Sequence, residues 1–387
     1  MPVSYPYTQY TGIWNLSAAS KAKGAGTWPV PPAPKLYVWG DGGSGALGLG
    51  NTTRYSSPKQ LGALTNWSKL SAGGGFGIAI KTDGTLWSWG SNSRGQLGVG
   101  NNTNYSSPVQ IGALTAWYEI STGTGFVLST KTDGTLWAWG RGTFGQLGLG
   151  DTADRSSPTQ VGALTNWLNI AGGFYHSLAV KTDGTLWSWG FNNAGQLGLG
   201  NATYYSSPKQ VGALTGWLKV SGGNYYSLAI KTNGTLWSWG QNNQGQLGLG
   251  NTSNYNSPKQ VGALTNWSSV SASSLFSVAV KTDGTLWAWG YNNFGQLGLG
   301  DTTYRVSPVQ IGALTNWSQV KNGVAFCVAI KTDGTLWSWG QGATYGALGL
   351  GNVTNYSSPK QVGALTSWTT LCRSMSGSNS VLAIAVN

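Results

Sequence analysis

Ten carboxylate side chains are the first candidates for chemistry in this sequence of 387 residues. Five of them occupy the same place in a recurring phrase, Lys-Thr-Asp-Gly: Asp83, Asp133, Asp183, Asp283 and Asp333. Asp151 and Asp301 replace the Asn that otherwise follows Gly-Leu-Gly, and Asp41, Glu119 and Asp154 stand in three unrelated contexts. Glycosidase-type acid–base catalysis uses a pair of carboxylates flanking the reacting bond. The sequence shows no such pair, which argues against an enzyme of this kind.

His176 is the single histidine and could serve as a base or a ligand. The alternative is a hydrogen-bonded residue at a repeat position that otherwise holds aromatic residues, and we favour it. Those aromatic residues are Phe76, Phe126, Tyr226, Phe276 and Phe326. Cys327 and Cys372 form neither a disulfide framework nor a metal site, and two buried thiols are favoured over one bond between them. No glycine-rich string carries a P-loop lysine. The sequence therefore predicts a non-enzymatic protein without a cofactor or a metal.

Charge in this sequence is sparse and evenly spread. Charged residues are 8% of the chain, against roughly 25% in an average soluble domain. The net charge is +12, but most lysines recur once per repeat, and none form the dense cluster that follows a phosphate backbone. We therefore expect no nucleic-acid partner. No apolar run approaches the ~20 residues of a membrane span, and no signal peptide follows Met1.

Tryptophan spacing reveals the elements that position these residues. One series, Trp39 to Trp339, recurs every fifty residues, and a second runs from Trp67 to Trp368, with one extra residue in its last step. Each unit predicts four short strands, with an Asp-Gly hairpin turn in which both turn residues take positive φ. Trp87 and Trp89 share a strand face and should pack between units. Seven such units without helical periodicity predict an all-β, closed seven-bladed β-propeller.

The two ends of the repeat region are complementary halves of one hairpin. Residues 34–40 match the second strand of that hairpin and lack the first, whereas residues 379–387 match the first and lack the second. Pairing between residues 35–39 and 381–386 would close the ring and remove two exposed strand edges. The residues predicted to make this closure are Leu36, Tyr37, Val38, Trp39, Leu382, Ile384 and Val386.

The segment "KTDGTLWSWGFNNAGQLGLG" at 181–200 resembles the regulator of chromosome condensation repeat family, whose members form seven-bladed propellers. The resemblance covers residues 35–387. It implies a histidine before the aliphatic strand, which only His176 supplies here. The best-known member is a nucleotide exchange factor that uses an inserted wedge and acidic contacts. The repeats here are nearly equal in length, which leaves no room for an inserted wedge, and they contain few acidic residues. Exchange activity therefore does not follow from the fold.

Residues 1–34 do not belong to the repeat and are predicted to be an N-terminal arm that anchors or assembles the propeller of residues 35–387. This segment resembles short N-terminal segments of tailed-phage virion proteins. Its aromatic and apolar side chains have no core of their own and favour burial on another surface. The predicted assembly residues are Tyr5, Tyr7, Tyr10, Ile13, Trp14, Leu16, Trp28 and Pro29.

The loops after Trp-Gly and after Gly-Leu-Gly are where the repeats differ. They are rich in Tyr, Asn and Arg, which suits either ordinary solvated turns or a ring of contacts. The candidate contact residues are Arg54, Tyr55, Arg94, Tyr105, Arg141, Phe144, Arg155, Phe191, Tyr204, Tyr205, Tyr255, Tyr291, Phe294, Tyr304, Arg305, Tyr345 and Tyr356.

Three hypotheses about function follow. The first is a structural protein that polymerises head-to-tail through its arm into filaments of stacked propellers, with copies of itself as partners. The second is a phage fibre or adhesin head that binds glycans or a host receptor through its loops and is anchored to virion proteins by its arm. The third is a protein-interaction scaffold like other members of the resembled family. The first two imply an extracellular or virion-associated location.

Overall fold

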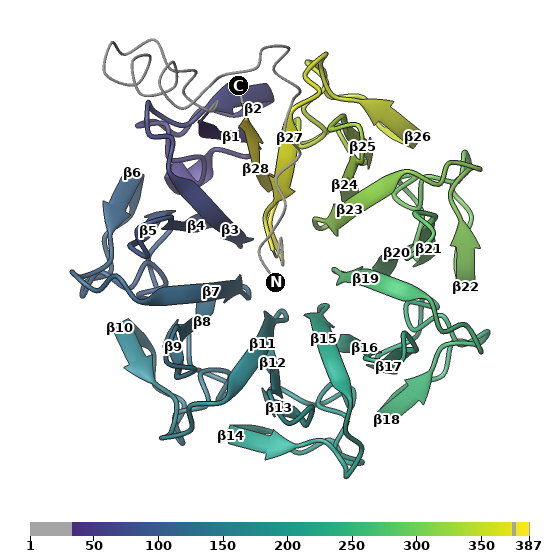
Figure 1. Cartoon of the computed structure of the whole chain (residues 1–387), viewed down its shortest axis with the longest axis horizontal. Helices are drawn as coiled ribbons and strands as arrows, with labels where there is room; N and C mark the ends of the chain where they lie inside the picture. The colour runs from purple at the N-terminus through teal and green to yellow at the C-terminus, as the bar shows by residue number, and fades with distance from the viewer. Residues whose placement is uncertain (1–32, 374–376, 387) are drawn as a thin grey trace, which may run out of the picture. The chain divides into compact units, whose positions relative to one another are not determined.

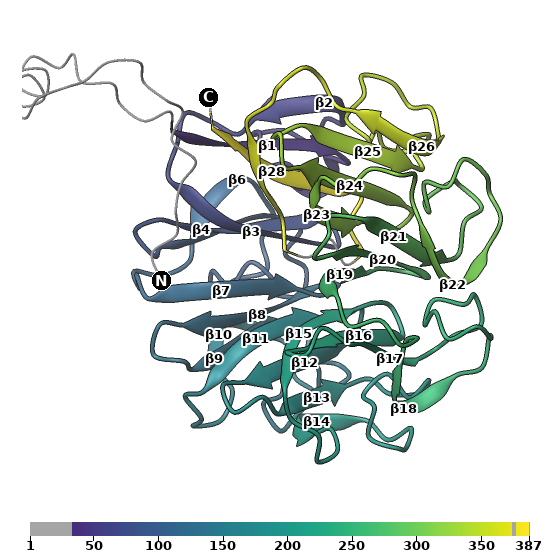
Figure 2. The ribbon, with the colours of Figure 1, turned by 45° about the vertical axis from the view of Figure 1, so that its right-hand side comes forward.

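The computed structural model describes residues 33–373 and 377–386, and they form seven four-stranded antiparallel sheets around one axis (Figure 1). The tilted view in Figure 2 shows the sheets stacked side by side around the ring. The only helical element in these residues is the short 3-10 turn η1 (Gly43–Gly45). The predicted all-β, seven-bladed propeller of fifty-residue repeats is confirmed.

Every blade has the same four strand positions, counted outward from the axis. The innermost strands are β3 (Trp67–Gly73), β7 (Trp117–Thr122), β11 (Trp167–Gly172), β15 (Trp217–Gly222), β19 (Trp267–Ala272), β23 (Trp317–Asn322) and β27 (Trp368–Leu371). The second strands are β4 (Phe76–Lys81), β8 (Phe126–Lys131), β12 (His176–Lys181), β16 (Tyr226–Lys231), β20 (Phe276–Lys281), β24 (Phe326–Lys331) and β28 (Ser380–Val386). The third strands are β1 (Pro34–Gly40), β5 (Leu86–Gly90), β9 (Leu136–Gly140), β13 (Leu186–Gly190), β17 (Leu236–Gly240), β21 (Leu286–Gly290) and β25 (Leu336–Gly340). The outer strands are β2 (Tyr55–Gln60), β6 (Tyr105–Gln110), β10 (Arg155–Gln160), β14 (Tyr205–Gln210), β18 (Tyr255–Gln260), β22 (Arg305–Gln310) and β26 (Tyr356–Gln361).

The ring closes by pairing the two ends of the propeller. β1 pairs with β28 in an antiparallel register that places Leu36 opposite Ile384 and Val38 opposite Leu382. The finished sheet has the order β2-β1-β28-β27, so its strands come from both ends of the chain. The predicted closure is therefore confirmed, and neither β1 nor β28 is left as a free edge.

The repeated Asp-Gly turn differs from the predicted one. Only Gly84 has a positive φ, of 78°, and Asp83 does not. Four residues separate β4 from β5, so the turn is longer than a two-residue hairpin loop, and the aspartate takes another role. Asp83 accepts hydrogen bonds from the Thr85 N–H at 2.9 Å and the Thr85 hydroxyl at 2.7 Å. These bonds lower the pKa of Asp83.

The same turn explains the lysine and the first tryptophan of the phrase. Thr85 Oγ1 accepts a hydrogen bond from Trp87 Nε1 at 3.0 Å, which orients the indole. The ammonium group of Lys81 then lies 3.8 Å from the centre of the Trp87 ring, in a cation–π contact. Five repeats keep this distance between 3.6 and 3.8 Å. In the sixth, where Asn233 replaces aspartate, it is 5.2 Å.

The second tryptophan of the phrase connects neighbouring blades, as predicted. Trp239 is fully buried, and its Nε1 donates to the carbonyl oxygen of Gln196 in the preceding blade at 2.9 Å. Equivalent bonds link every pair of neighbours at 2.9–3.1 Å. The indole also lies against Gly198, where an added Cβ would be 2.8 Å from Trp239 Nε1. This close approach explains the second glycine of the Gly-Gln-Leu-Gly bend.

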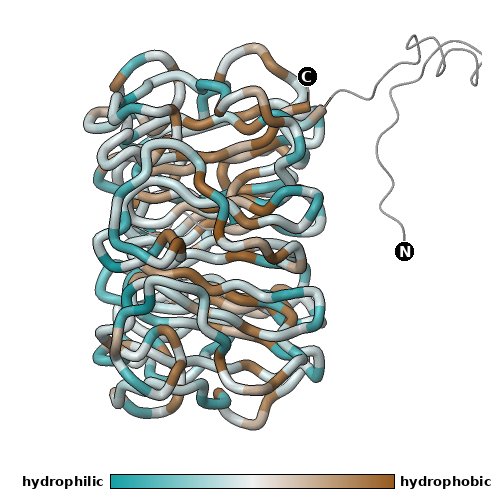
Figure 3. Tube along the Cα trace, turned by 90° about the vertical axis from the view of Figure 1, so that its left-hand side faces the viewer, coloured by the Kyte–Doolittle hydropathy of each residue, from teal (hydrophilic) through white to brown (hydrophobic). Residues whose placement is uncertain are grey.

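The inner strand of each blade is an edge whose backbone groups need partners. Side chains from the preceding blade supply them. The Thr122 N–H donates to Ser71 Oγ at 3.1 Å, and the Ala272 N–H donates to Ser221 Oγ at 2.9 Å. At the outer edge, Pro58 lies in β2, where the absence of an N–H costs no ladder bond. Figure 3 shows hydrophobic stretches along the strands and hydrophilic stretches in the loops.

Residues 1–32 of the predicted arm, with all its assembly residues from Tyr5 to Pro29, lie outside the described residues, whereas Pro34 belongs to β1 and pairs with Val386. The role of the arm stays a prediction, as does the division of the chain into an arm and a propeller.

Trp239→Phe should destabilise the propeller by about 2–4 kcal/mol, because it leaves a cavity and removes a buried hydrogen bond between blades. Urea unfolding measures this loss. Trp237→Phe is the matched control in the same strand, and because Trp237 is only partly buried we expect it to cost about 1 kcal/mol or less. Equal losses for the two variants would contradict a special role of the buried indole.

Candidate functional site

The connections between strands emerge at two opposite faces of the propeller. Because successive strands are antiparallel, the turn after each inner strand and the connection after each third strand leave at the same end. A hydrogen bond joins these two connections, for example from Phe191 N to Tyr175 O at 3.0 Å. We call this end the loop face. The other end, which we call the turn face, carries the Asp-Gly turns. The sequence differences between repeats are concentrated at the loop face.

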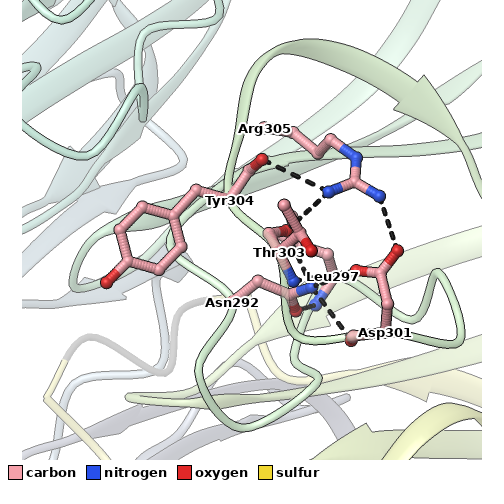
Figure 4. A network of polar contacts seen from close by, with 6 residues as sticks. All are labelled: Asn292, Leu297, Asp301, Thr303, Tyr304 and Arg305. Carbon is pink, nitrogen blue, oxygen red and sulfur yellow. Dashed lines mark hydrogen bonds and ion pairs between the residues drawn. The ribbon is translucent and has the colours of Figure 1, made fainter.

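Four of the long loops of the loop face are held by a polar network around a buried asparagine, and Figure 4 shows one of them. Asn292 Nδ2 donates to the carbonyl oxygens of Asp301 at 3.1 Å and Thr303 at 3.0 Å, and its Oδ1 accepts from Leu297 N at 2.9 Å. Arg305 donates to the Asp301 carboxylate at 2.6 Å and to the Thr303 carbonyl at 2.8 Å. The loop is thereby fixed, while Tyr304 stays 42% exposed.

The Tyr and Arg residues that begin the outer strands serve this network. Where the loop has Asn, the residue four positions on is Tyr, as in Asn101 Nδ2 to Tyr105 Oη at 3.1 Å. Where the loop has Asp, that residue is Arg, as in Asp151 with Arg155 at 2.5 Å. The predicted contact residues whose polar ends are used within their own loops are Tyr55, Tyr105, Arg155, Tyr205, Tyr255, Arg305 and Tyr356.

A continuous aromatic cluster on the loop face draws its side chains from three blades. These blades, β7–β10, β11–β14 and β15–β18, are neighbours in the ring (Figure 1). The Phe191 ring is 4.9 Å from Phe144, 4.6 Å from Tyr204 and 5.8 Å from Tyr225, measured between ring centres. The Arg141 guanidinium lies 4.7 Å from the Tyr175 ring centre. We call this set the aromatic cluster, and its members are Arg141, Phe144, Phe174, Tyr175, Phe191, Tyr204 and Tyr225.

Three members of the aromatic cluster were missed by the sequence analysis: Phe174, Tyr175 and Tyr225. They lie in the turns after β11 and β15, where the first blade has Gly74 and Gly75. The sequence signal for them was the presence of large aromatic residues in two adjacent repeats, at positions where that blade has glycine. The turn lies beside the long loop only because two strands fold back on each other, so no spacing in the sequence reveals the contact.

The remaining predicted contacts form smaller groups. Tyr291 contacts Tyr304 at 5.1 Å and Phe294 at 6.5 Å between ring centres, and these three residues form a second aromatic group. Arg54 pairs with Asp41 at 3.2 Å and lies 5.0 Å from the Tyr345 ring centre.

The last of the predicted contact residues, Arg94, pairs with Asp154 of the next blade at 3.4 Å. None of the smaller groups equals the aromatic cluster in extent.

The residues that first suggested chemistry have structural roles. His176 is fully buried, and its Nε2 lies 2.9 Å from Ser227 Oγ. Burial lowers the pKa of His176 to about 3. Cys327 and Cys372 are both free and buried, and burial raises the pKa of the Cys372 thiol to about 11. Within residues 33–373 and 377–386, no three His, Cys, Asp or Glu side chains gather as metal ligands.

Comparison with protein-family models identifies the chain. A model described as the RCC1-like domain matches residues 32–280, and the model of the regulator of chromosome condensation (RCC1) repeat matches residues 283–330 and 333–384. The chain belongs to the RCC1-like family. A second RCC1 repeat model matches residues 267–296. A comparison with curated proteins found no match.

Solved structures share the fold at low sequence identity. Human WBSCR16 is 22% identical with a TM-score of 0.80, covering 91% of this chain and 99% of that one. Prp20p from Saccharomyces cerevisiae, described with its binding to Gsp1p and histones, is 21% identical with a TM-score of 0.81 and 92% coverage of both chains. Yeast RCC1 (Prp20) bound to Kap60 is 19% identical with a TM-score of 0.81, covering 100% of this chain and 97% of that one.

The comparisons correct one prediction and leave another without support. The extracellular or virion-associated location is wrong, because the human and yeast proteins named above, which share this propeller, are intracellular. The resemblance of the N-terminal segment to phage virion proteins finds no counterpart among the matches. In the part of the chain that the structure describes, no helix has the length and hydropathy of a membrane span.

His176→Phe should flatten the pH dependence of stability. The unfolded histidine titrates near 6.5 and the folded one at about 3, so the unfolded chain binds an extra proton between these values. The unfolding free energy of the wild type is therefore largest above pH 6.5 and falls on acidification by up to about 1.4 kcal/mol per pH unit from this group. Phenylalanine, which four other repeats have here, removes this dependence.

Urea unfolding between pH 4 and pH 8 measures this effect as the difference between wild type and variant. The difference between the two proteins should be constant from about pH 7.5 to pH 8 and should change progressively below pH 6. Parallel curves throughout this range would show that the histidine is not buried in its neutral form.

Proposed function

We propose that this protein is a non-enzymatic, RCC1-like interaction scaffold that binds a protein partner through the aromatic cluster on its loop face. The observation that carries the proposal is the continuity of the cluster, in which six rings and one guanidinium from three blades contact one another at the surface. Aromatic and arginine side chains dominate the energetics of protein–protein interfaces. The family membership and the yeast neighbour described as binding Gsp1p and histones support a protein partner.

Rigidity of the loops supports the same conclusion. The polar networks hold the long loops from within, so the cluster is ordered before a partner arrives. Tyr204 is 45% exposed, and the other six members are partly buried, so each keeps surface for contact. Because little side-chain freedom remains to be lost on binding, more of the interaction energy is available for affinity.

The turn face offers a weaker alternative. The connection before each inner strand carries one leucine that is 39–52% exposed: Leu64, Leu114, Leu164, Leu214, Leu264, Leu314 and Leu365. Tyr118, Leu168 and Leu218, near the starts of β7, β11 and β15, are also exposed. The leucines of the connections recur around the whole ring and mark no single side of it, and exposed apolar residues are common on protein surfaces. The aromatic cluster is contiguous and lies on one side of the ring, which favours a single directed contact.

The other two hypotheses from the sequence have less support. Neither filament assembly nor glycan binding corresponds to anything in the matched families or structures, and the arm on which assembly depends lies outside the described residues. The scaffold hypothesis agrees with the family and uses residues whose arrangement is known.

The repeat itself supplies the variants that test the proposal. The residues of the next blade that correspond to Phe191 and Tyr204 are Gln241 and Asn254. A Phe191→Gln, Tyr204→Asn double variant therefore replaces the centre of the cluster with the residues that the same loop has in the next blade. The matched control makes the same two changes in the second aromatic group, as Tyr291→Gln and Tyr304→Asn.

Immobilised wild type and both variants would be compared by quantitative mass spectrometry of proteins retained from a lysate of the source cell. The proposal predicts a protein retained by wild type and control but reduced at least about tenfold on the cluster variant, the loss expected for two interface anchors. Retention that is equal on all three proteins, or lost only with the control, would overturn it.

A further inference from the structure

The axial channel of the propeller contains a cavity of about 240 Å³ that no function above uses. Six of the seven blades contribute to its lining, through β7, β11, β15, β19, β23 and Arg373, the second residue after the end of β27. The three cationic groups of the lining are Lys219, Lys321 and Arg373. They are more than 50 residues apart in sequence, and only closure of the ring brings them together.

Positive charge in this channel exceeds negative charge. Glu119 is the acidic side chain of the inner strands, and it already pairs with two cations, Lys69 at 2.8 Å and Arg373. The other nine carboxylates of the sequence lie in the Asp-Gly turns or in the loop-face connections. Lys219 and Lys321 therefore have no carboxylate partner. Channels lined by one sign of charge concentrate counter-ions.

The two lysines are close enough to influence each other. The pKa of Lys321 is lowered by burial in the channel; the neighbouring Cys372 opposes this shift, and the charge of Lys219 adds to it. Lys219 Nζ donates one bond to the Ser268 carbonyl oxygen at 2.6 Å and keeps two further protons. No hydrogen bond joins Lys321 Nζ to another described residue. An anion between the two ammonium groups would satisfy these donors and remove the repulsion.

Hydroxyl groups complete the donor set. Ser121 and Ser221 also line the cavity, and each accepts a backbone N–H bond, from Gly172 at 3.1 Å and from Ala272 at 2.9 Å. Each hydroxyl thus has its own proton available, because none of the described residues accepts it. Two ammonium groups and two hydroxyls match the charge and the several acceptor oxygens of a phosphate group.

We propose that the axial channel is a binding site for a phosphate-type oxyanion, held between Lys219 and Lys321 with Ser121 and Ser221 as further donors. Arg373 lies at the same cavity and is held in place by Glu119 and by a bond to the Ile170 carbonyl oxygen at 3.2 Å across the channel. It is a positioning residue that lines one side of the cavity and adds to the positive electrostatic potential there. This site is separate from the loop-face cluster and does not depend on the proposed partner.

The repeat again provides substitutions that keep the fold. Gln319 is the counterpart of Lys219 in another blade, and its Nε2 donates to the Thr369 carbonyl oxygen at 2.7 Å, just as Lys219 donates to Ser268. Lys219→Gln therefore removes the charge and keeps the bond between blades. Lys321→Ser installs the residue that four other repeats have at this position. Lys209→Thr together with Lys259→Thr removes two charges from the outer rim as a control, since Thr159 stands there in another blade.

Isothermal titration calorimetry of the full chain at fixed ionic strength would use two probes, inorganic pyrophosphate and a short phosphoserine peptide. We expect saturable binding of one anion per chain, weakened at least about tenfold by Lys219→Gln or Lys321→Ser and less than about twofold by the rim control. Binding of pyrophosphate would indicate a free anion, and binding of the peptide alone would indicate a phosphorylated chain segment as the ligand.

Two outcomes would overturn the proposal. One is the absence of saturable binding of either probe to the wild type. The other is binding that the channel variants leave unchanged, or that the rim control weakens as much as they do. Circular dichroism melting curves of every variant verify that lost binding is not lost folding.

Discussion

One buried hydrogen bond, repeated at every blade junction, is the constraint on which this propeller depends. The indole N–H of the second tryptophan in each repeat donates to a carbonyl oxygen of the preceding blade, at 2.9–3.1 Å in all seven cases. The bond from Trp39 to Ala347 joins the first repeat to the last. Because an unpaired indole N–H would be costly in this dry interior, each blade requires its neighbour in one orientation.

The sameness of the repeats follows from this constraint. The carbonyl must lie where the indole can reach it, and the glycine beside the indole must have no side chain. The turn that orients the first tryptophan needs Asp or Asn, then Gly and Thr. These requirements leave little freedom in the strands or at the turn face. The long loops of the loop face are held from within by their own Asn or Asp network, so their tips are free to differ.

Much of this architecture is predictable from the sequence, because its causes are periodic. The tryptophan spacing predicts the blade count, and the half-hairpins at the two ends predict the pairing of Leu36 with the strand that contains Ile384. The turn geometry at Asp83 is not predictable from Asp-Gly alone. Asp83 does not take the positive φ of a two-residue hairpin loop, and its carboxylate instead accepts a hydrogen bond from Thr85. The pairing of Asp301 with Arg305 within one loop is visible in the sequence only as a coupled exchange of Asn and Tyr.

The candidate sites are harder to predict, because ring geometry creates them. Tyr225 contacts Phe191 from the next blade, and Lys219 and Lys321, which come from blades separated by one other, line the same cavity. No spacing within one repeat encodes either approach. Membership of the RCC1-like family is evident from the repeat, whereas both candidate sites depend on single positions where one blade departs from the others.

The central claim is that the repeats are scaffold and that recognition takes place where the loop face departs from them. Hydrogen–deuterium exchange of the protein with and without its captured partner tests this most directly. The account predicts slower exchange in residues 141–146, 173–175 and 191–204, with the Asp-Gly turns unchanged. Slower exchange confined to the turn face, in residues 82–85 and their counterparts, would contradict it.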